Sequence, residues 1–327
     1  EILRRLGYKH IICEPEQMKI DGDFPTVKNP NPEYKEGFYL AIDLAKKNDV
    51  DLIIGTDPDA DRVGIAVNHH GEYILPTGNE VGVLMLDYIA KQRIAQGTMP
   101  KNPVAVKSIV STPLADVVAK SYGIQMINVL TGFKYIGEQI TLLEQKGEEN
   151  RFLLGFEESY GYMTGGHVRD KDAVNGSMII CEMAQYYKRQ GKTLIDALND
   201  IFARFGVYAS KVKGYTYEGT EGMETMAGIM KRLRENPPKS FSGYKVLACA
   251  DYQISKRKDF RSGGEADISL PTSNVLEYDL ENNLKVIVRP SGTEPKIKVY
   301  LTIVTNDKQQ IPIIEQRLFD AADMLMR

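Results

Sequence analysis

The sequence predicts an α/β fold: two similar mixed α/β domains followed by a smaller α+β domain. Short apolar runs alternate with helical patterns of about 10–15 residues over the first two thirds of the chain, as in βαβ units with a parallel sheet. The alternation pauses near residue 98 and restarts near residue 104, and after Gly206 strand-like runs follow one another. We therefore expect domains at residues 1–99, 100–205 and 206–327.

Length, composition and charge agree with this prediction and exclude other classes of protein. The 327 residues, 43% of them hydrophobic and 26% charged, suffice for two or three domains. Lys and Arg number 41 against 44 Asp and Glu, a net charge of −3, which disfavours nucleic acid as a partner. No apolar run approaches the roughly 20 residues of a membrane-spanning helix, so we expect no membrane partner. The scattered Cys13, Cys181 and Cys249 fit neither a disulfide framework nor a zinc site, and indicate a cytoplasmic protein.

The first domain begins inside a helical pattern. Residues 1–8 resemble the last turns of an amphipathic helix that Gly7 closes, so we expect a longer chain upstream. We then expect a helix at 32–49, strands at 51–54 and 63–67, and a helix at 79–96 with Asn79 as its N-cap.

The second and third domains follow the same reasoning. In the second, we expect strands at 104–110, 125–130 and 152–155, and helices at 113–122, 134–145, 172–190 and 194–205. In the third, we expect helices at 221–235 and 307–327, and strands at 245–250, 275–278, 284–288 and 297–304.

Three aspartates, Asp57, Asp59 and Asp61, stand at alternate positions between two strand-like runs. In an extended or curved loop this spacing brings them to one side, where the carboxylates repel one another unless a cation binds. Hard oxygen ligands suit Mg²⁺. The alternative is an acidic surface turn. An EF-hand is excluded, because Arg62 stands where that motif needs Gly and Asn68 where it needs Glu.

A second polar loop directly follows the strand at 152–155. Glu157 and Ser159 could face one ligand there, and a glutamate suits vicinal sugar hydroxyls. Downstream, His167, Arg169 and Lys171 follow within a Gly-rich stretch, and a cationic loop beside a polar pocket suits a phosphate. The alternatives are an ordinary polar loop and a solvated basic turn.

The loop with Arg289, Ser291, Gly292 and Thr293 joins two strand-like runs. One arginine, two hydroxyls and a glycine make a phosphate cradle, although a long hairpin turn is equally consistent with these residues. Its spacing is not that of a Walker loop.

Two further motifs carry weaker signals. Residues 131–134, Thr-Gly-Phe-Lys, stand between a strand and a helix, a place for a substrate-facing Lys134, although an isolated lysine is more often solvated. His69 and His70 precede Gly71 in an expected hairpin turn, and without a third ligand nearby in sequence we expect an exposed pair rather than a metal site.

Together, the loops at 55–62, 155–161 and 289–295 resemble, in order and rough spacing, those of the α-D-phosphohexomutase family, which contains phosphoglucomutases and phosphomannomutases. The resemblance covers essentially the whole chain and includes residues 131–134 and 168–172. The D-P-D-A-D-R sequence is similar to that of bacterial phosphoglucomutases related to glucose-1,6-bisphosphate and phosphopentose mutases. The resemblance implies four domains around a cleft, of which this chain would hold most of the second, and the third and fourth.

The resemblance also implies a reaction and a role for each loop. A phosphoryl group moves between O1 and O6 of a hexose, with glucose favoured, through a phosphoserine and a bisphosphorylated sugar; glucose 1,6-bisphosphate is then intermediate and activator. Asp57, Asp59 and Asp61 would hold Mg²⁺, with Arg62 and Lys134 as catalytic residues. Substrate would be bound by Thr131, Gly132, Glu157, Ser159, His167, Lys171, Arg289, Ser291, Gly292 and Thr293.

One departure from the family pattern concerns the phosphoryl donor, a serine in an S-H-N-P-type loop. The four histidines follow Lys9, Asn68, His69 and Gly166, so no Ser-His pair exists in these residues. We therefore expect the donor on an N-terminal domain of the same protein, and these residues to be inactive alone.

Other functions stay open on the sequence. Within the family, a phosphomannomutase or phosphopentomutase is possible. Outside it, a strand followed by D-x-D is typical of haloacid-dehalogenase-like phosphatases, although a third aspartate replaces the usual Thr or Val and the other loops would have no role. A non-catalytic module that binds sugar phosphates is the remaining alternative.

Overall fold

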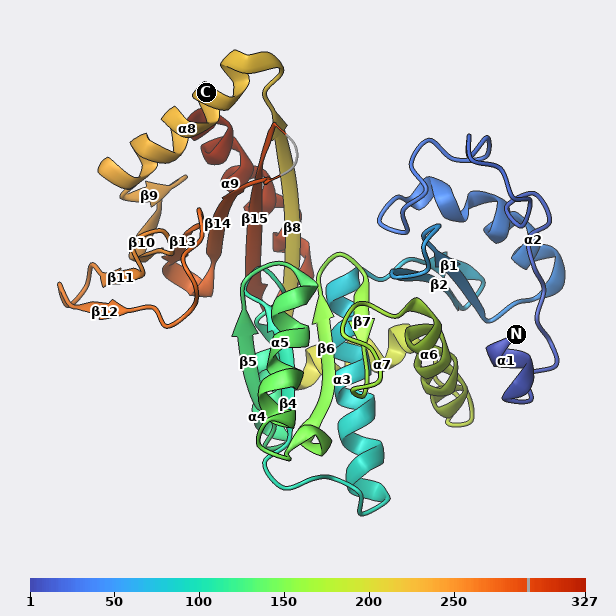
Figure 1. The fold of residues 1–327 in the computed structure, drawn as a ribbon. Coiled ribbons are helices and arrows are strands. Elements are labelled where there is room, and N and C mark those ends of the chain that lie inside the picture. The colour runs from blue at the N-terminus through green and yellow to red at the C-terminus, as the bar shows by residue number, and fades with distance from the viewer. Residues whose placement is uncertain (293–294) are drawn as a thin grey trace. The chain divides into compact units, whose positions relative to one another are not determined.

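The computed structural model describes residues 1–292 and 295–327. These form two compact units, Glu1–Phe205 and Gly206–Arg327, which are described separately below. The first contains α/β layers and the second a helix-backed sheet, so the predicted class, α/β followed by a smaller α+β part, is confirmed (Figure 1). Within the described ranges, no helix combines the length and apolar character that crossing a bilayer demands.

The first unit alternates helices and strands along the chain. Its helices are α1 (Ile2–Arg5), α2 (Tyr39–Asn48), α3 (Gly78–Ala95), α4 (Leu114–Ser121), α5 (Phe133–Glu144), α6 (Ala173–Lys188) and α7 (Leu194–Phe205), with the 3-10 helices η1 (Lys35–Phe38) and η2 (Glu149–Arg151). Its strands are β1 (Leu52–Thr56), β2 (Val63–His69), β3 (Glu72–Ile74), β4 (Val104–Ser108), β5 (Gln125–Val129), β6 (Phe152–Glu157) and β7 (Gly161–Met163).

The first sheet has the order β1-β2-β3 and is antiparallel throughout. The expectation of a parallel sheet in this region is therefore wrong. Only residues 57–62 connect β1 to β2, whereas a parallel crossover needs about a dozen residues or more. The loop that carries the aspartates is consequently the tip of a hairpin. One face of this sheet packs on Phe38 and Ala45 from η1 and α2.

The second sheet has the order β5-β4-β6-β7, with β4 parallel to both neighbours, as the alternating pattern predicts. Helices cover both faces. In β6, Gly155 faces Ile136 of α5, while the next residue, Phe156, faces Gly82 of α3. Because alternate strand residues point to opposite faces, α5 and α3 lie on opposite sides of this sheet (Figure 1). Strand β6, which packs between these two helices, leads directly into the predicted sugar-binding loop.

Two helix starts differ from the prediction. Thr77, not Asn79, caps α3: the Thr77 hydroxyl accepts from Glu80 N at 3.3 Å, and the Glu80 carboxylate accepts from Thr77 N at 2.7 Å. Asn79 is buried and instead accepts from Thr112 N at 2.8 Å. The helix expected from residue 32 begins only at η1, since Asn31 accepts from Glu33 N in a turn.

The second unit is one long sheet backed by two helices. Its elements are β8 (Val207–Thr216), α8 (Gly219–Glu235), β9 (Ser240–Phe241), β10 (Tyr244–Asp251), β11 (Lys256–Asp259), β12 (Glu265–Asp267), β13 (Leu276–Leu280), η3 (Glu281–Asn283), β14 (Lys285–Pro290), β15 (Lys296–Thr305), η4 (Lys308–Gln310) and α9 (Ile311–Leu325). The strand order is β12-β11-β10-β13-β14-β15-β8, and β9 also pairs with β10.

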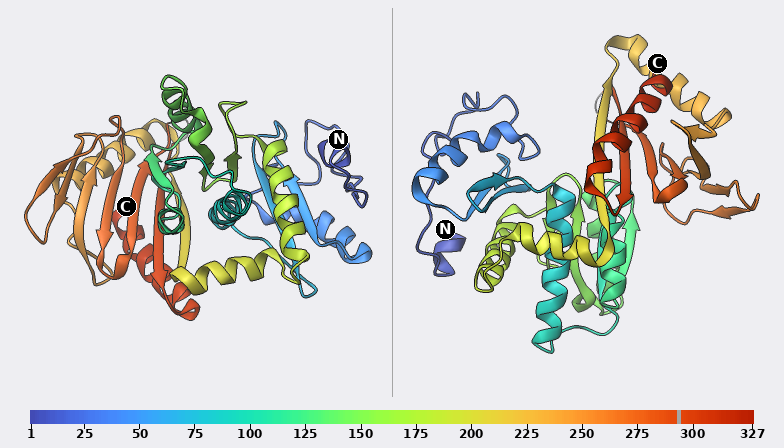
Figure 2. Two further views of the ribbon diagram at one scale, coloured as in Figure 1. Left: turned by 90° about the horizontal axis from the view of Figure 1, so that it is seen from below. Right: turned by 180° about the vertical axis from the view of Figure 1, so that it is seen from behind.

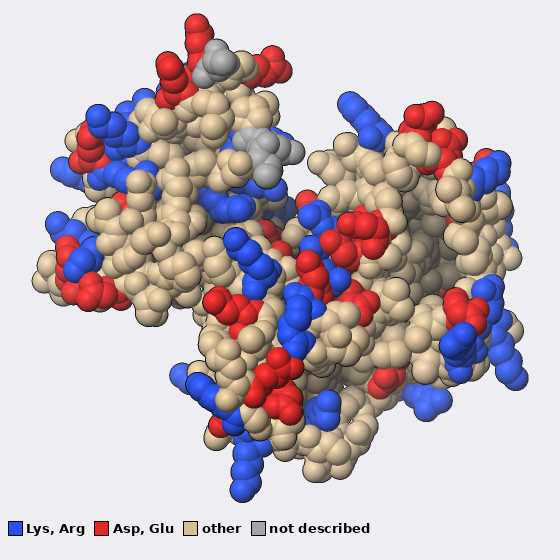
Figure 3. Space-filling view, viewed as in Figure 1, with Lys and Arg blue, Asp and Glu red and all other residues tan. Residues whose placement is uncertain are grey.

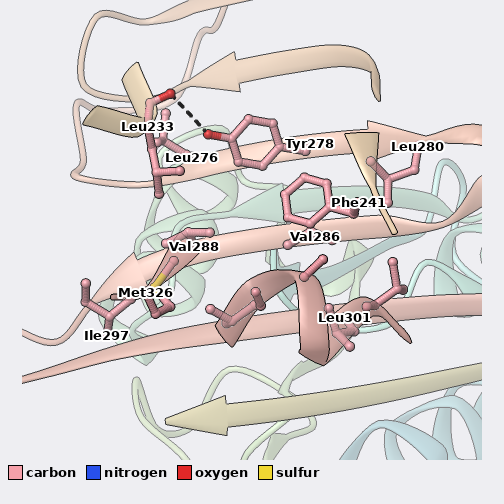
Figure 4. Close-up of a cluster of buried hydrophobic side chains, with 14 of the residues drawn as sticks. Leu233, Phe241, Leu276, Tyr278, Leu280, Val286, Val288, Ile297, Leu301 and Met326 are labelled. Carbon is pink, nitrogen blue, oxygen red and sulfur yellow. Dashed lines mark hydrogen bonds between the residues drawn. The ribbon is translucent and has the colours of Figure 1, made fainter. Parts of the chain in front are cut away.

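Helices α8 and α9 share one core with a single face of this sheet (Figure 2). Leu233 of α8 and Leu318 of α9 are both buried in that core, together with Val286 and Leu301 from the strands. Figure 4 shows these strand side chains, and the hydroxyl of buried Tyr278 donating to Leu233 O at 3.4 Å. This packing fixes the β14–β15 hairpin, whose connection is the predicted phosphate-binding loop.

Charged side chains are interspersed on the surface. On the face shown in Figure 3, acidic and basic groups alternate without a broad area of one sign, in keeping with the net charge of −3.

Candidate functional site

The three aspartates of the β1–β2 hairpin converge. One carboxylate oxygen from each of Asp57, Asp59 and Asp61 lies within 4.8 Å of the others. The loop is shaped by its first member, because Asp57 Oδ1 accepts from the backbone N–H groups of Asp61 at 3.1 Å and Arg62 at 2.9 Å. Ala60 takes a positive φ of 56° that completes this tight turn. The hairpin therefore holds the carboxylates on one side, as the spacing predicts.

The electrostatics of this loop favour a cation. Burial raises the pKa of Asp57, and the neighbouring carboxylates of Asp61 and Asp59 raise it further, against the backbone hydrogen bond from Arg62. Asp61 Oδ1 is buried and has no hydrogen-bond partner within residues 1–292 and 295–327. A buried unsatisfied oxygen is a place for an unseen water or ion. Three crowded carboxylates with one unsatisfied oxygen fit a hard divalent cation such as Mg²⁺.

Arg62 follows the third aspartate and is held by carboxylates. Its Nε lies 3.8 Å from Asp57 Oδ2 and 3.8 Å from Asp61 Oδ1, and its Nη1 donates to Glu33 Oε1 at 3.2 Å. From the sequence, Glu33 is only a residue of the helix expected at 32–49. Its partner lies 29 positions away, and no local pattern could have revealed the pair.

Backbone contacts join the aspartate hairpin to the loop after β6. Val63 N donates to Tyr160 O at 3.1 Å, and Arg62 forms an isolated antiparallel bridge with Gly161. A further hydrogen bond runs to the hairpin from the start of α6, from Ala173 N to Ala60 O at 3.1 Å. Residues 57–63 and 157–161, nearly 100 positions apart in the sequence, thus form one continuous surface.

Lys171 lies between these two loops. Its ammonium pairs with Asp61 Oδ2 at 2.8 Å and Asp170 Oδ1 at 3.2 Å, and lies 5.7 Å from the centre of the Phe133 ring. Burial alone would lower the pKa of Lys171, but the two carboxylates outweigh it and raise it, so the group is a fixed positive charge. Gly161 leaves room for the side chain of Lys171, because a Cβ on residue 161 would lie 2.5 Å from Lys171 Cδ.

Glu157 ends β6 and contacts the loop before α5. It is 6% exposed, and its Oε1 accepts from Gly132 N at 2.6 Å. Gly132 has a φ of +125°, a conformation that side-chain-bearing residues rarely adopt. The adjacent Thr131 Oγ1 is buried without a hydrogen-bond partner in the described part of the chain. The fold thus brings Thr131, Gly132 and Glu157 together, and the hydroxyl of Thr131 can still form a hydrogen bond with a ligand.

The remaining residues predicted in this unit lie nearer to solvent. Ser159 lies in the turn between β6 and β7. His167 is exposed, and its Nε2 lies 3.3 Å from Asp172 Oδ2, while Asp172 also caps α6. Lys134 is exposed, with its ammonium 5.0 Å from the ring centre of Tyr135. The substrate-binding and catalytic roles of these three residues stay predictions.

The predicted phosphate-binding loop belongs to the second unit. It closes the β14–β15 hairpin, where Arg289 pairs in register with Lys298, and Ser291 N donates to Lys296 O at 2.7 Å. Gly292 is exposed, and a Cβ placed on it would meet no atom within 4 Å from the described residues beyond its immediate chain neighbours. Thr293 lies outside the described residues. The hairpin turn and the phosphate cradle are both compatible with this geometry.

Comparison with known proteins assigns the family. The family model "Phosphoglucomutase/phosphomannomutase, alpha/beta/alpha domain II" matches residues 1–71, and the corresponding domain III model matches residues 77–205. A phosphoglucomutase from Staphylococcus epidermidis is 37% identical over 322 residues, 98% of this chain. The chain belongs to the phosphoglucomutase/phosphomannomutase family. A phosphoglucomutase from Staphylococcus aureus is 38% identical over 304 residues, 93% of this chain.

These relatives are longer than this chain, which spans 57% of the S. epidermidis protein and 54% of the S. aureus protein. Solved structures of the family share the fold. A phosphoglucomutase/phosphomannomutase family protein from Burkholderia thailandensis superimposes with a TM-score of 0.61 at 15% identity, over 94% of this chain and 53% of that one. Parafusin, a phosphoglucomutase from Paramecium, gives 0.60 at 18% identity, over 91% of this chain and 51% of that one.

Proposed function

We propose that this chain is the metal-binding and sugar-phosphate-binding part of a phosphohexomutase that interconverts hexose 1-phosphate and hexose 6-phosphate, with glucose as the sugar. The observation that supports this most is the continuity of two loops. The carboxylates of Asp57, Asp59 and Asp61 lie within 4.8 Å of one another, and backbone bonds join their hairpin to the loop that contains Glu157. Curated relatives named phosphoglucomutase support the choice of a mutase over a phosphatase or a binding module.

In this proposal Asp57, Asp59 and Asp61 hold Mg²⁺. The ion would neutralise charge on the transferring phosphoryl group, which such reactions need more than covalent help from the protein. Arg62 adds a planar cation beside the same loop, held in place by Glu33. Lys171, with its raised pKa, keeps a second positive charge 2.8 Å from Asp61.

The sugar would be bound by the neighbouring loops. Glu157 and Ser159 would hydrogen-bond its hydroxyls, with Thr131, Gly132, His167 and Lys171 around it. Thr131 Oγ1, which is buried and has no hydrogen-bond partner among the described residues, supports a polar ligand at this point. Lys134 is a proposed catalytic residue, and Lys134, His167 and Lys171 are the candidates for proton transfer.

The loop of Arg289, Ser291, Gly292 and Thr293 would hold the phosphate that does not react. An arginine fork, hydroxyls and an open glycine suit phosphate oxygens. We further propose glucose 1,6-bisphosphate as the activating intermediate, a donor serine on another domain of the same protein, and a cytoplasmic location. Free thiols at Cys13, Cys181 and Cys249 are consistent with a reducing compartment.

Asp59→Asn tests the metal site. Asp59 is exposed, whereas Asp57 shapes the loop through two backbone hydrogen bonds, so Asp59 can lose its charge without loss of the turn. In a calorimetric titration of the chain we expect Mg²⁺ or Mn²⁺ affinity to fall about tenfold, roughly 1.4 kcal/mol. Asp51→Asn is the matched control, because Asp51 is an exposed aspartate paired with Lys188 outside the loop.

Equal affinity in the wild type and Asp59→Asn would remove this loop from the metal-binding role. Equal losses in Asp59→Asn and Asp51→Asn would mean that only the general negative charge of the surface attracts the ion. Either result would mean that Asp57, Asp59 and Asp61 do not form the metal site that the proposed function requires.

A further inference from the structure

A second group of metal-ligating side chains lies away from the loops described above. One ring nitrogen from each of His69 and His70 and one carboxylate oxygen of Asp196 all lie within 4.8 Å of one another. His70 is exposed, as expected, whereas His69 is half-buried and lies beside Asp196. Asp196 is distant in the sequence but adjacent in the fold, and it supplies the third ligand that the local sequence lacks.

The backbone explains how two consecutive histidines reach the same place. Neighbouring residues of a regular strand point to opposite faces. His69 is the last residue of β2, opposite Glu72 of β3, but His70 and Gly71 form a two-residue turn with φ values of 57° and 94°. The left-handed His70 leaves the strand alternation, and the two imidazole centroids lie 4.3 Å apart. Type I′ turns of this kind favour Asn or Gly at the first position, so histidine is an unusual choice there.

The start of α7 holds the carboxylate in position. Thr193 donates to Asp196 Oδ2 from both its N and its Oγ1, each at 2.8 Å, and Asp196 N donates back to Thr193 Oγ1 at 3.2 Å. His69 Nδ1 lies 2.9 Å from the same Thr193 hydroxyl and 4.0 Å from Asp196 Oδ2. The side chain of His69 is only 22% exposed. Two of the three ligands are thus fixed before any ion binds.

The simplest alternative is a helix cap with a histidine beside it. That account explains Thr193, Asp196 and His69, but it gives no role to the imidazole of His70. A carboxylate has about four lone-pair positions on its two oxygens, so the cap leaves capacity for a metal ion. His70 is exposed, and an ion can reach the group from solvent.

We propose that His69, His70 and Asp196 bind one first-row transition-metal ion of the Zn²⁺ type. Imidazole nitrogens prefer such ions, whereas the all-oxygen set of Asp57, Asp59 and Asp61 prefers Mg²⁺. Three protein ligands leave a coordination position for water. The ion would join the β2–β3 hairpin to the first turn of α7, and so cross-link two segments of the first unit. This site is independent of the proposed mutase chemistry.

His70→Asn is the decisive variant. Asn followed by Gly is a favoured type I′ turn, so the substitution removes the imidazole and keeps the fold. The 327-residue chain, without a histidine tag, is titrated with Zn²⁺ in millimolar Mg²⁺, which occupies the oxygen ligands. We expect His70→Asn and His69→Gln each to weaken Zn²⁺ binding by about tenfold or more, as loss of one of three ligands should. His10→Asn is the matched control, since His10 is exposed and outside the group, and should bind as the wild type does.

Thermal unfolding provides the second readout. An ion that binds only the folded state raises the melting temperature, so at equal Zn²⁺ concentration the shift should be clearly smaller for His70→Asn than for the wild type and His10→Asn. Without Zn²⁺, wild type and His70→Asn should melt alike, which separates metal binding from a folding defect. Equal Zn²⁺ affinity in the wild type, His69→Gln and His70→Asn would overturn the proposal. A Zn²⁺-induced shift of the same size in His70→Asn and the wild type would overturn it as well.

Discussion

The 327-residue chain alone should show no interconversion of glucose 1-phosphate and glucose 6-phosphate. The reaction that we propose needs a group that stores the phosphoryl moiety covalently between substrates. No serine in the sequence is followed by histidine, as the family's donor motif would require. In the proposed function the aspartates of the loop at 57–62 hold the metal ion, so none of them serves as the phosphoryl carrier.

A coupled assay that oxidises glucose 6-phosphate checks this expectation, with Mg²⁺ and catalytic glucose 1,6-bisphosphate present. The S. epidermidis phosphoglucomutase, a longer relative, is the positive control. Turnover by the chain comparable to that control would show that the donor lies within these residues, and the proposed roles would have to be reassigned.

Arg289→Ala should weaken binding of glucose 1-phosphate by about 10- to 100-fold, while binding of glucose itself changes little. Hydrogen bonds to charged groups contribute roughly 1.5–3 kcal/mol, which corresponds to this range. Arg289 lies near the end of β14, three residues before Gly292, and in the proposed function its guanidinium meets phosphate oxygens. Calorimetry with the two ligands measures the difference.

Arg261→Ala is the matched control for this variant. Arg261 is an exposed arginine of the same unit whose guanidinium pairs locally with Asp259, so its removal should leave glucose 1-phosphate binding unchanged. Similar losses for glucose and glucose 1-phosphate in Arg289→Ala would mean that the β14–β15 loop shapes the protein without recognising phosphate.

The observed secondary structure agrees with the sequence-based prediction where a single pattern extends over a whole element. Helix α6 and strand β6 lie close to their predicted positions. Strand β6 is a short, continuous, fully buried apolar run, and α6 is a long helical pattern that its N-cap Asp172 begins. Strand β8 was not predicted. It carries Lys211 and Lys213 on an edge of the sheet, and it is a strand because it pairs with β15 along its length. Such pairing is a long-range property that a local window does not contain.

The candidate site was likewise predictable from the sequence only in its local part. The aspartate spacing predicted the carboxylate cluster, since the hairpin that joins those residues is local. The pairs Arg62–Glu33 and Lys171–Asp61 were not predictable, because each joins segments that only the folded chain brings together. The group of His69, His70 and Asp196 is a third example, in which the local pattern alone indicated an exposed histidine pair.

Relaxation of the sugar protons of glucose 1-phosphate by bound Mn²⁺ tests the central claim, that the aspartate hairpin and the loop of Glu157 form one site. Relaxation by a paramagnetic ion falls steeply with distance, so it reports whether metal and sugar are neighbours. We expect strong relaxation with the wild type and with Asp51→Asn, and its loss with Asp59→Asn. Binding of both Mn²⁺ and glucose 1-phosphate to the wild type without enhanced relaxation would contradict the account.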